Sequence, residues 1–305
     1  SQEKPTVLPR TSEVQPIENR QELIFKAMED EMLRNRQNLF IAGLKSPHFY
    51  SYTVADAKFI AINCYLGGII YSNEKVLNSH NTSVLVGSNK FNNLNFFDEN
   101  SLYSSQSDLP LAQELDYTNI RNSFWIASDS KYKSAAEIIE TKTVSIAQQV
   151  LPPDLLSLPD YYPVDVKTNY LQDESVPVSK SLLEDLGIQL SKIFENYPNF
   201  TNSGVRINAA DASIYYISSE QMKFKQPFHL ITIRVFAQTR AEDGEMLTDY
   251  VDLYYTSQNE IPLLNVLTQQ VKTMADRLEQ LRTAPVISEA YSGPVMFIED
   301  AVAEV

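Results

Sequence analysis

Residues 228–255 hold two runs of alternating apolar and polar residues on either side of Glu242-Asp243-Gly244. The apolar residues of the first run are Ile231, Ile233, Val235 and Ala237. Alternation with a period of two is typical of a β-strand, and an acidic pair followed by Gly is a common tight turn between antiparallel strands. The stretch therefore predicts one long β-hairpin. Its second arm, residues 247–255, is less regularly apolar, and we expect it nearer a sheet edge.

This second arm carries the residues that could meet a partner, namely Asp249, Tyr250, Asp252, Tyr254 and Tyr255. An edge strand leaves backbone groups unpaired, so an extended peptide can add to the sheet there, and the aromatic and acidic side chains would favour basic or apolar peptides. The alternative is that the two acids only protect the edge against aggregation. Both interpretations stay open at the level of the sequence.

The charge balance argues against nucleic acid as a partner. The chain of 305 residues has 25 Lys and Arg against 39 Asp and Glu, a formal charge of −14, which repels a phosphate backbone. Its densest basic patch, Lys131, Lys133 and Lys142, is interrupted by Glu137 and Glu140, as on a solvated helix face. With 43% hydrophobic residues, the chain can build the cores of two ordinary domains.

Neither the cysteine nor the apolar runs fix a compartment. Cys64 is single, so no intrachain disulfide forms, and its apolar neighbours predict a buried thiol. No apolar run reaches the about 18–20 residues that span a bilayer, so we expect no membrane role. The localisation stays open between the bacterial cytoplasm and, if a leader was removed before Ser1, the periplasm or the exterior.

Apolar periodicity gives the order of elements in the first half of the chain. A helical stripe runs from Glu18 to Ala42 and ends at Gly43. Gly67-Gly68 is expected to form a bulge or turn rather than a phosphate loop. The remaining expected elements are short strands at 49–54, 58–66, 69–71 and 83–87 in an antiparallel meander, a polar loop at 98–107 and a helix at 117–149.

The second half follows a segment rich in proline. Five of the fifteen prolines lie between Leu151 and Val178, which predicts a linker. Ser181 with Glu184, and Ser257 with Glu260, match the capping box that begins a helix. The last helix has apolar residues in alternating steps of three and four, which favours core packing or, alternatively, a seam for a partner helix. These residues are Leu264, Leu267, Val271, Met274, Leu278 and Leu281.

The two halves share an order of elements with an offset of 155 residues. Ala55-Asp56-Ala57 falls on Ala210-Asp211-Ala212, each between strand-like residues. The identities are few, so coincidence is the alternative. We expect an α+β fold of two related units, each an antiparallel sheet backed by helices. The expected domains are a disordered lead-in 1–16, a first α+β unit 17–150, a Pro-rich linker 151–178, a second α+β unit 179–285, and 286–305 as the start of a C-terminal segment that is cut short.

A search for catalytic and metal-binding patterns finds none. The three histidines, His48, His80 and His229, lie far apart, and none has a partner at the four-residue spacing of a zinc helix. No Gly-x-Ser-x-Gly marks a nucleophile, and the eight glycines form no phosphate-binding loop. We therefore expect no catalytic, cofactor-binding or metal-binding residue in this chain.

Three segments are similar to motifs of one protein family. The first is Pro47-His48-Phe49-Tyr50-Ser51-Tyr52-Thr53-Val54, which is similar to a Pro-x-Tyr-Phe-x-x-Tyr-Thr strand. The second runs from Asp116-Tyr117 through Arg121 and Trp125 to Lys133, and is similar to Asp-Tyr-x-x-x-Arg…Trp-x-x-Thr-Asp-x-x-Tyr-Lys. The third, Tyr291-Ser292-Gly293-Pro294-Val295-Met296-Phe297, is similar to Gly-Pro-Val-Leu-Phe. Together they resemble the TldD/PmbA family, once called modulators of DNA gyrase and now regarded as zinc metallopeptidases.

The second segment also suggests how its own side chains are used. Trp125, Ser128, Asp129 and Tyr132 are spaced three and four residues apart, as on one face of a helix. We expect Trp125 to be largely buried, and Asp129 to make a local hydrogen bond rather than act as a general base.

The resemblance implies the N-terminal half of such a peptidase. The family carries its zinc ligands on a His-Glu-x-x-x-His helix downstream of the Gly-Pro-Val-Leu-Phe segment, and this sequence stops before it, at Val305. Zinc would then belong to the missing C-terminal half, and this chain alone would be inactive. The family likeness further implies a homo- or heterodimer with a family member and a cleft for unfolded peptide.

Two functions follow for this chain. In the first, it is the non-catalytic, substrate-guiding and dimer-forming region of a TldD/PmbA-like metallopeptidase. In the second, it is a stand-alone binding or scaffold protein that keeps the fold without peptidase chemistry. An enzyme with its own unrecognised site is a third. A His-Glu-x-x-x-His motif encoded beyond Val305 would favour the first, and a stop codon would favour the second.

Overall fold

The computed structural model describes residues 19–96, 109–148, 158–163, 165, 168–171, 177–285, 292–297 and 302. Most of the two expected α+β units lies within these ranges. Four expected segments lie wholly or in large part outside the described residues: the lead-in 1–16, the polar loop 98–107, the linker 151–178 and the C-terminal segment 286–305.

An eight-stranded sheet runs through the described part of the chain. Its strands are β1 Pro47–Tyr65, β2 Gly68–Val76, β3 Ser79–Val86, β4 Leu109–Pro110, β5 Thr168–Tyr170, β6 Phe200–Ser218, β7 Lys223–Arg240 and β8 Met246–Tyr255. The order is β4-β3-β1-β6-β7-β5, with β2 also paired to β1 and β8 also paired to β7. Neighbours are antiparallel, except that β5 runs parallel to β7.

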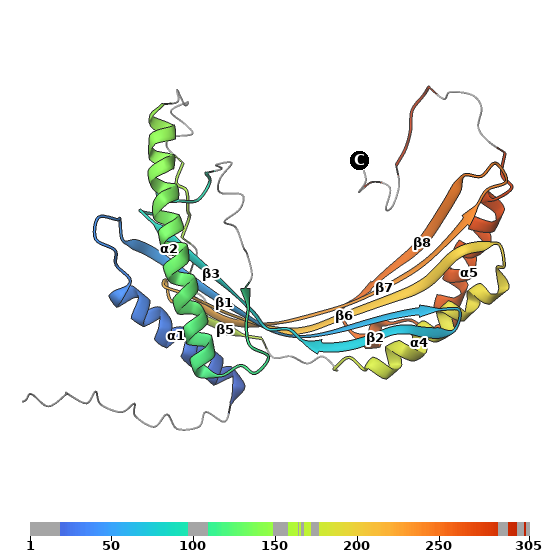
Figure 1. Ribbon diagram of the computed structural model, residues 1–305, viewed down its shortest axis with the longest axis horizontal. Helices are drawn as coiled ribbons and strands as arrows, with labels where there is room; N and C mark the ends of the chain where they lie inside the picture. The colour runs from blue at the N-terminus through green and yellow to red at the C-terminus, as the bar shows by residue number, and fades with distance from the viewer. Residues whose placement is uncertain are drawn as a thin grey trace, which may run out of the picture.

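Helices back this sheet at its two ends. The helices that the structure describes are α1 Arg20–Asn38, α2 Tyr117–Ala147, α4 Lys180–Lys192 and α5 Leu264–Leu281, with the short 3-10 helices η2 Ile193–Asn196 and η3 Gln258–Glu260. Figure 1 shows α1 and α2 at one end of a strongly curved sheet, and α4 and α5 at the other. The expected α+β class, with an antiparallel sheet backed by helices, is confirmed. Among the described helices, none has the length and apolar character that crossing a membrane requires.

Both pairs of helices bury the same face of the sheet. On β1, Tyr52 and Val54 belong to the core shared with α1 and α2, whereas Ile60 and Ile62 belong to the core shared with α4 and α5. All four positions are even-numbered, and alternate side chains of a strand point to one face. The opposite face of the sheet, on which Phe59 is only partly buried, is left without a described helix.

The pairing of β1 with β6 joins the two halves of the chain in one sheet. Ser51 to Cys64 pair without interruption with Ser218 to Val205. Ala57 lies opposite Ala212, its counterpart 155 residues later, so the offset of the expected repeat coincides with the strand register. Each half then runs helix, three strands, helix, apart from the two-residue β4. The two halves differ in their further pairing, because β2 and β3 both pair with β1, whereas β8 pairs with β7 and not with β6.

The aspartate of the repeated motif has a similar role in each half. The Asp56 carboxylate accepts a hydrogen bond from Arg20 Nε at 2.6 Å, and the Asp211 carboxylate lies 3.0 Å from His229 Nδ1. Asp56 and Asp211 are on the helix-facing side of their strands, between the two cores. Each polar side chain is thereby paired with a basic group where the sheet is not covered by a core.

The expected meander of four short strands is wrong in its first half. Residues 49–54 and 58–65 belong to a single strand, β1, which ends one residue before the expected end at Leu66, and residues 69–71 are part of the longer β2. The polar and small residues of Ala55-Asp56-Ala57 interrupt the apolar pattern and predict a break. Pairing with β6 on one side, and with β3 and then β2 on the other, keeps the strand extended through them.

One of the two expected capping boxes is correct. Ser257 and Glu260 form a complete capping box, although the helix that it begins is η3 and α5 starts only at Leu264. At α4 the cap is Ser179 rather than Ser181, and its hydroxyl accepts from the Leu182 N–H. No box forms at Ser181, because this residue lies inside α4 and is not its N-cap, and the Glu184 carboxylate instead accepts from Ser72 Oγ at 2.5 Å.

Several local expectations are confirmed. β7 and β8 form the expected long hairpin, with Gly244 at the turn in the left-handed region at φ 95°. Gly67, at φ 75°, forms the turn between β1 and β2. Cys64 is buried, with 2% of its surface exposed. The last helix uses Leu267, Val271, Met274 and Leu278 for the core of the same sheet end.

Tyr52 ties α1 and α2 to the sheet from within the first core. Its hydroxyl accepts a hydrogen bond from Asn35 Nδ2 of α1 at 2.7 Å and lies 2.8 Å from Ser128 Oγ of α2. Its ring stacks on Phe124 with centroids 4.3 Å apart. Burial raises the pKa of Tyr52 to about 12, so the hydroxyl stays protonated at neutral pH. All three polar side chains are fully buried.

Tyr52→Phe should lower the free energy of unfolding by ~1–3 kcal/mol, because Asn35 and Ser128 lose a buried hydrogen-bond partner while the packing volume is kept. Urea unfolding followed by circular dichroism measures the change. Tyr162→Phe is the matched control, since Tyr162 is 64% exposed and should change stability by less than ~0.5 kcal/mol. Equal stability of the two variants would show that the buried hydrogen bonds do not hold the helices.

Candidate functional site

The five residues predicted at the sheet edge lie on both faces of β8. Tyr250, Asp252 and Tyr254 alternate along the strand and share the face without helices, where Tyr250 is 51% and Tyr254 65% exposed. Asp249 and Tyr255 point to the face that α5 covers, and Tyr255 packs against the core there. The predicted set is therefore not one cluster but two rows on a single strand.

Both acids of β8 are already paired with arginines. The Asp249 carboxylate accepts from Arg277 Nε of α5 at 2.7 Å, and the Asp252 carboxylate accepts from Arg234 Nε of β7 at 2.7 Å. The hydrogen bond to Asp252 raises the pKa of Arg234, whose guanidinium also lies over the Tyr250 ring at 5.1 Å. The edge thus presents neutralised ion pairs rather than free negative charge.

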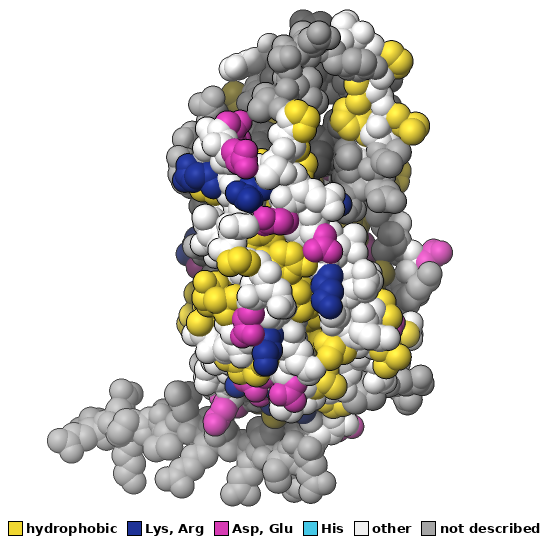
Figure 2. Space-filling model, turned by 90° about the vertical axis from the view of Figure 1, so that its right-hand side faces the viewer, with side chains coloured by type: hydrophobic (Ala, Val, Ile, Leu, Met, Phe, Trp, Pro, Cys, Tyr) yellow, Lys and Arg dark blue, Asp and Glu magenta, His cyan; other side chains and the backbone are white. Residues whose placement is uncertain are grey.

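A groove of about 810 Å³ runs beside β8 on the side of α5. Its lining consists of Val251 of β8 and of Asn265, Val266, Gln269, Gln270, Thr273, Met274 and Arg277 of α5. Within the described residues β8 pairs only with β7, so the groove adjoins a strand edge that has no described neighbour. In the space-filling view of this end, hydrophobic side chains lie among uncharged ones, and acidic and basic side chains are interspersed (Figure 2).

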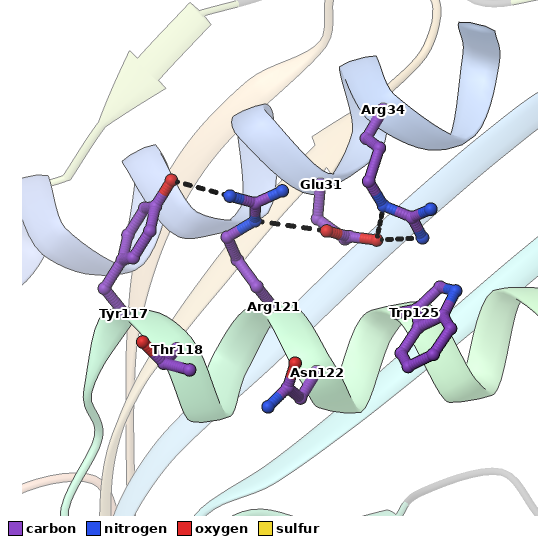
Figure 3. Close-up of a pocket in the computed structure, with 7 residues that line it drawn as sticks. All are labelled: Glu31, Arg34, Tyr117, Thr118, Arg121, Asn122 and Trp125. Atoms are coloured by element: carbon purple, nitrogen blue, oxygen red, sulfur yellow. Dashed lines mark hydrogen bonds and ion pairs between the residues drawn. The ribbon is translucent and has the colours of Figure 1, made fainter. Parts of the chain in front are cut away.

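A second pocket, of about 380 Å³, lies between α1 and α2 at the other end of the sheet. Figure 3 shows Glu31 between the guanidinium groups of Arg34 and Arg121, with Tyr117 and Trp125 along α2. Only 2% of Glu31 is exposed, and its carboxylate accepts from Arg34 Nε at 2.7 Å and from Arg121 Nε at 3.1 Å. Arg121 also donates to the Tyr117 hydroxyl at 3.0 Å.

Asp30 lies beside this network. Burial alone would raise its pKa, but hydrogen bonds from Lys26 and from the Tyr117 hydroxyl lower it below the ordinary value. The donor distances are 2.9 Å and 2.6 Å, respectively. Asp30 is therefore ionised at neutral pH, and the charges of Lys26 and, less strongly, of Arg121 also lower its pKa.

The second motif of the sequence supplies most of the α2 side of this pocket. Asp116 is the N-cap of α2 and accepts from the Thr118 and Asn119 N–H groups, and Tyr117 and Arg121 contact α1. The expected local bond of Asp129 is confirmed, since its carboxylate accepts from Lys133 Nζ at 2.6 Å. Sequence reasoning missed Glu31 and Arg34, whose spacing of three residues on α1 was the available signal.

The expected burial of Trp125 is wrong. Its side chain is 52% exposed, and the Arg34 guanidinium lies over its ring at 5.6 Å. Phe124, one residue earlier, takes the fully buried position against Tyr52 and His80. Trp125 is therefore part of the pocket wall rather than of the core.

The described residues do not fit a zinc site. No group of three or more His, Cys, Asp or Glu that could hold a metal exists among them. His48 Nε2 pairs with Asn89 Oδ1 at 3.1 Å, His80 packs edge-on against Phe124, and His229 pairs with Asp211. Burial lowers the pKa of His48. The three histidines thus lie in three separate environments on the sheet.

Comparison with known proteins gives likenesses among solved structures only. No model of a protein family matches the sequence, and no curated protein matches it. A candidate modulator of a DNA gyrase from Thermotoga maritima is similar over 84% of this chain and 47% of its own, with 7% identity and a TM-score of 0.47. TldE from Thermococcus kodakarensis is similar over 83% of this chain and 46% of its own, with 12% identity and a TM-score of 0.42.

A candidate modulator of DNA gyrase from Bacteroides thetaiotaomicron is similar over 86% of this chain and 48% of its own, with 10% identity and a TM-score of 0.45. The chain thus spans less than half the length of each of these three proteins. These three solved structures are proteins of the TldD/PmbA family.

Proposed function

We propose that this chain is a non-catalytic region that guides unfolded polypeptide, binding it as an added strand on β8. The observation that carries the proposal is the edge of β8 beside the 810 Å³ groove of α5. An extended peptide added to a sheet edge gains main-chain hydrogen bonds, and pockets for its alternate side chains supply selectivity. The groove lies where one row of these side chains would point.

The chemistry of the groove predicts which peptides bind. Val251, Val266 and Met274 provide apolar surface. The side-chain amides of Asn265, Gln269 and Gln270 on α5 provide uncharged hydrogen-bond donors and acceptors. The other row of peptide side chains would lie beside Tyr250 and Tyr254 on the face without helices. Small apolar and neutral polar side chains suit both rows, and the bound peptide need not carry a charge.

The expected preference for basic peptides is not part of this proposal. It depended on Asp249 and Asp252 as free charges, whereas each forms a two-point ion pair with an arginine. One observation supports the alternative that the acids protect the edge of β8 against aggregation. The Asp249 carboxylate also accepts from the Tyr250 N–H at 2.9 Å, so that one backbone donor of the strand is already occupied.

The dimer-forming role belongs to the same proposal, with a second copy or a family member as the partner. Its support is the sheet face without helices, where Phe228, Tyr250 and Tyr254 are each 45–65% exposed. Aromatic and Arg side chains are enriched at protein interfaces, and Arg206 and Arg234 lie on this face over the rings of Phe236 and Tyr250. A peptidase activity, its zinc and its substrates would be supplied by other parts of a longer protein. A stand-alone scaffold protein would use the same edge.

Peptide binding can be tested with fluorescently labelled, unstructured peptides that are acetylated and amidated, one basic and one acidic, at physiological salt. The chain should bind both with affinities within about tenfold of each other, because the one charged residue that lines the groove, Arg277, is paired with Asp249. Thr273→Trp fills the groove and should weaken binding by about tenfold or more, whereas Gln280→Trp, exposed on the same helix outside the groove, should not. Fluorescence anisotropy measures each dissociation constant.

Two results would contradict the proposal. One is the absence of binding to either peptide at high micromolar concentration by a chain that circular dichroism shows to be folded. The other is equal loss of affinity in the Thr273→Trp and Gln280→Trp variants. Either result would leave protection against aggregation as the role of the β8 acids.

The purified chain should retain far less than one zinc per molecule and hydrolyse no peptide. In the part of the chain that the structure describes, the three separate histidines, the buried cysteine and the carboxylates form no group of three that could hold a metal. Elemental analysis after dialysis against a weak chelator measures the zinc content. One zinc per chain that survives dialysis, and that is lost when His48, His80 or His229 is replaced by Ala, would refute the non-catalytic assignment.

A further inference from the structure

Trp125 is the only tryptophan of the chain, and it stands half-exposed at the mouth of the pocket between α1 and α2. Tryptophan is costly to leave in water, because its ring is large and mostly apolar. Trp and Arg are enriched among the interface residues that contribute most of the binding free energy. Trp125 therefore lies outside the core and indicates that this pocket is a candidate binding site.

The pocket holds two guanidinium groups in fixed positions. Glu31 is buried and accepts from the Nε atoms of both Arg34 and Arg121, while Asn35 Oδ1 accepts from Arg34 and the Tyr117 hydroxyl accepts from Arg121. These bonds use only part of the five N–H donors that each guanidinium offers. The remaining donors belong to side chains that line the pocket, and they are already ordered before a ligand arrives.

The charge of the pocket is positive in a chain of net charge −14. Two arginines share the single carboxylate of Glu31, and the nearby Asp30 is paired with Lys26 and Tyr117. One positive charge is thus left over at the site. Arginine binds carboxylates in a fork-to-fork geometry, which a point charge such as lysine cannot reproduce.

We propose that this pocket binds the C-terminal carboxylate of a polypeptide, with the last side chain of that polypeptide against the ring of Trp125. A terminal residue offers a carboxylate next to an apolar group, which matches guanidinium groups next to an indole. Thr118 and Asn122 line the same pocket and can bond the last peptide group. A volume of about 380 Å³ suits one or two residues rather than a folded partner.

The site is separate from the groove beside β8. α1 and α2 lie at one end of the curved sheet, and α5 with β8 lies at the other (Figure 1). A peptide with an amidated end can add to β8 but lacks the group that this pocket recognises. Strand addition and carboxylate binding can therefore succeed or fail independently.

The fluorescence of Trp125 provides the direct readout, because no other tryptophan contributes. We would titrate the chain with acetyl-Ala-Ala-Phe carrying a free carboxylate, with the same peptide amidated, with acetyl-Ala-Glu-Ala-amide and with inorganic phosphate. The free-acid peptide should change the emission in a saturable manner. The amide, the side-chain carboxylate and phosphate should each bind at least about tenfold more weakly, since a charged hydrogen-bond pair or the apolar contact is lost.

Arg34→Gln and Arg121→Gln should each weaken binding of the free-acid peptide by about tenfold or more. Lys133→Gln, which removes a positive charge from the exposed side of α2, should leave it unchanged. If an arginine variant does not fold, the comparison of acid and amide on the native chain still decides the question. Emission that does not respond to the free acid, equal binding of acid and amide, or tighter binding of phosphate would overturn the proposal.

Discussion

The hydrogen-bonded pairing of β1 with β6 is the interaction on which the rest of the structure depends. The two cores have no residue in common, one formed with α1 and α2 and the other with α4 and α5. They belong to one sheet because two 19-residue strands pair from Ser51 to Cys64. Continuous backbone pairing fixes the ends of the sheet relative to each other. It thereby fixes the distance between the pocket at α1 and the groove at α5.

Strand alternation then decides which surfaces are free to bind. The helices of both halves cover the same face, because even positions of β1 enter both cores. This arrangement leaves one sheet face without a described helix and the edge of β8 without a described strand neighbour. Both acidic residues of this edge form ion pairs, Asp249 with Arg277 of α5 and Asp252 with Arg234 of β7. The edge therefore carries polar groups that water can solvate, and these ion pairs present no net charge to an added peptide strand.

Much of the fold could be predicted from periodicity, because the hairpin of 228–255 and the helix of 117–149 bury regular patterns. The continuity of β1 could not, since pairing with β6 overrides the weak strand preference of Ala55-Asp56-Ala57. The prediction that Trp125 is buried was wrong for a different reason. Trp125 lies at the border of the buried side of α2, about 60° around the helix from the buried Ser128, whereas Phe124 lies within that side and packs against Tyr52.

The pocket illustrates what local sequence cannot supply. Glu31 and Arg34 are three residues apart on α1, and Arg121 lies 90 residues beyond Glu31, so only packing of α1 on α2 brings them together. Sequence placed Asp249, Tyr250, Asp252, Tyr254 and Tyr255 on one strand, as the structure has them. It could not reveal that arginines from two other elements neutralise the acids.

Hydrogen exchange of the β8 amides tests the central claim, strand addition at this edge, most directly. The rate for residues 246–255 would be compared with and without a saturating, amidated, unstructured peptide. The account predicts slower exchange at β8 amides that do not pair with β7, and unchanged exchange in β2. Unchanged exchange throughout β8, with protection appearing elsewhere on the sheet, would contradict it.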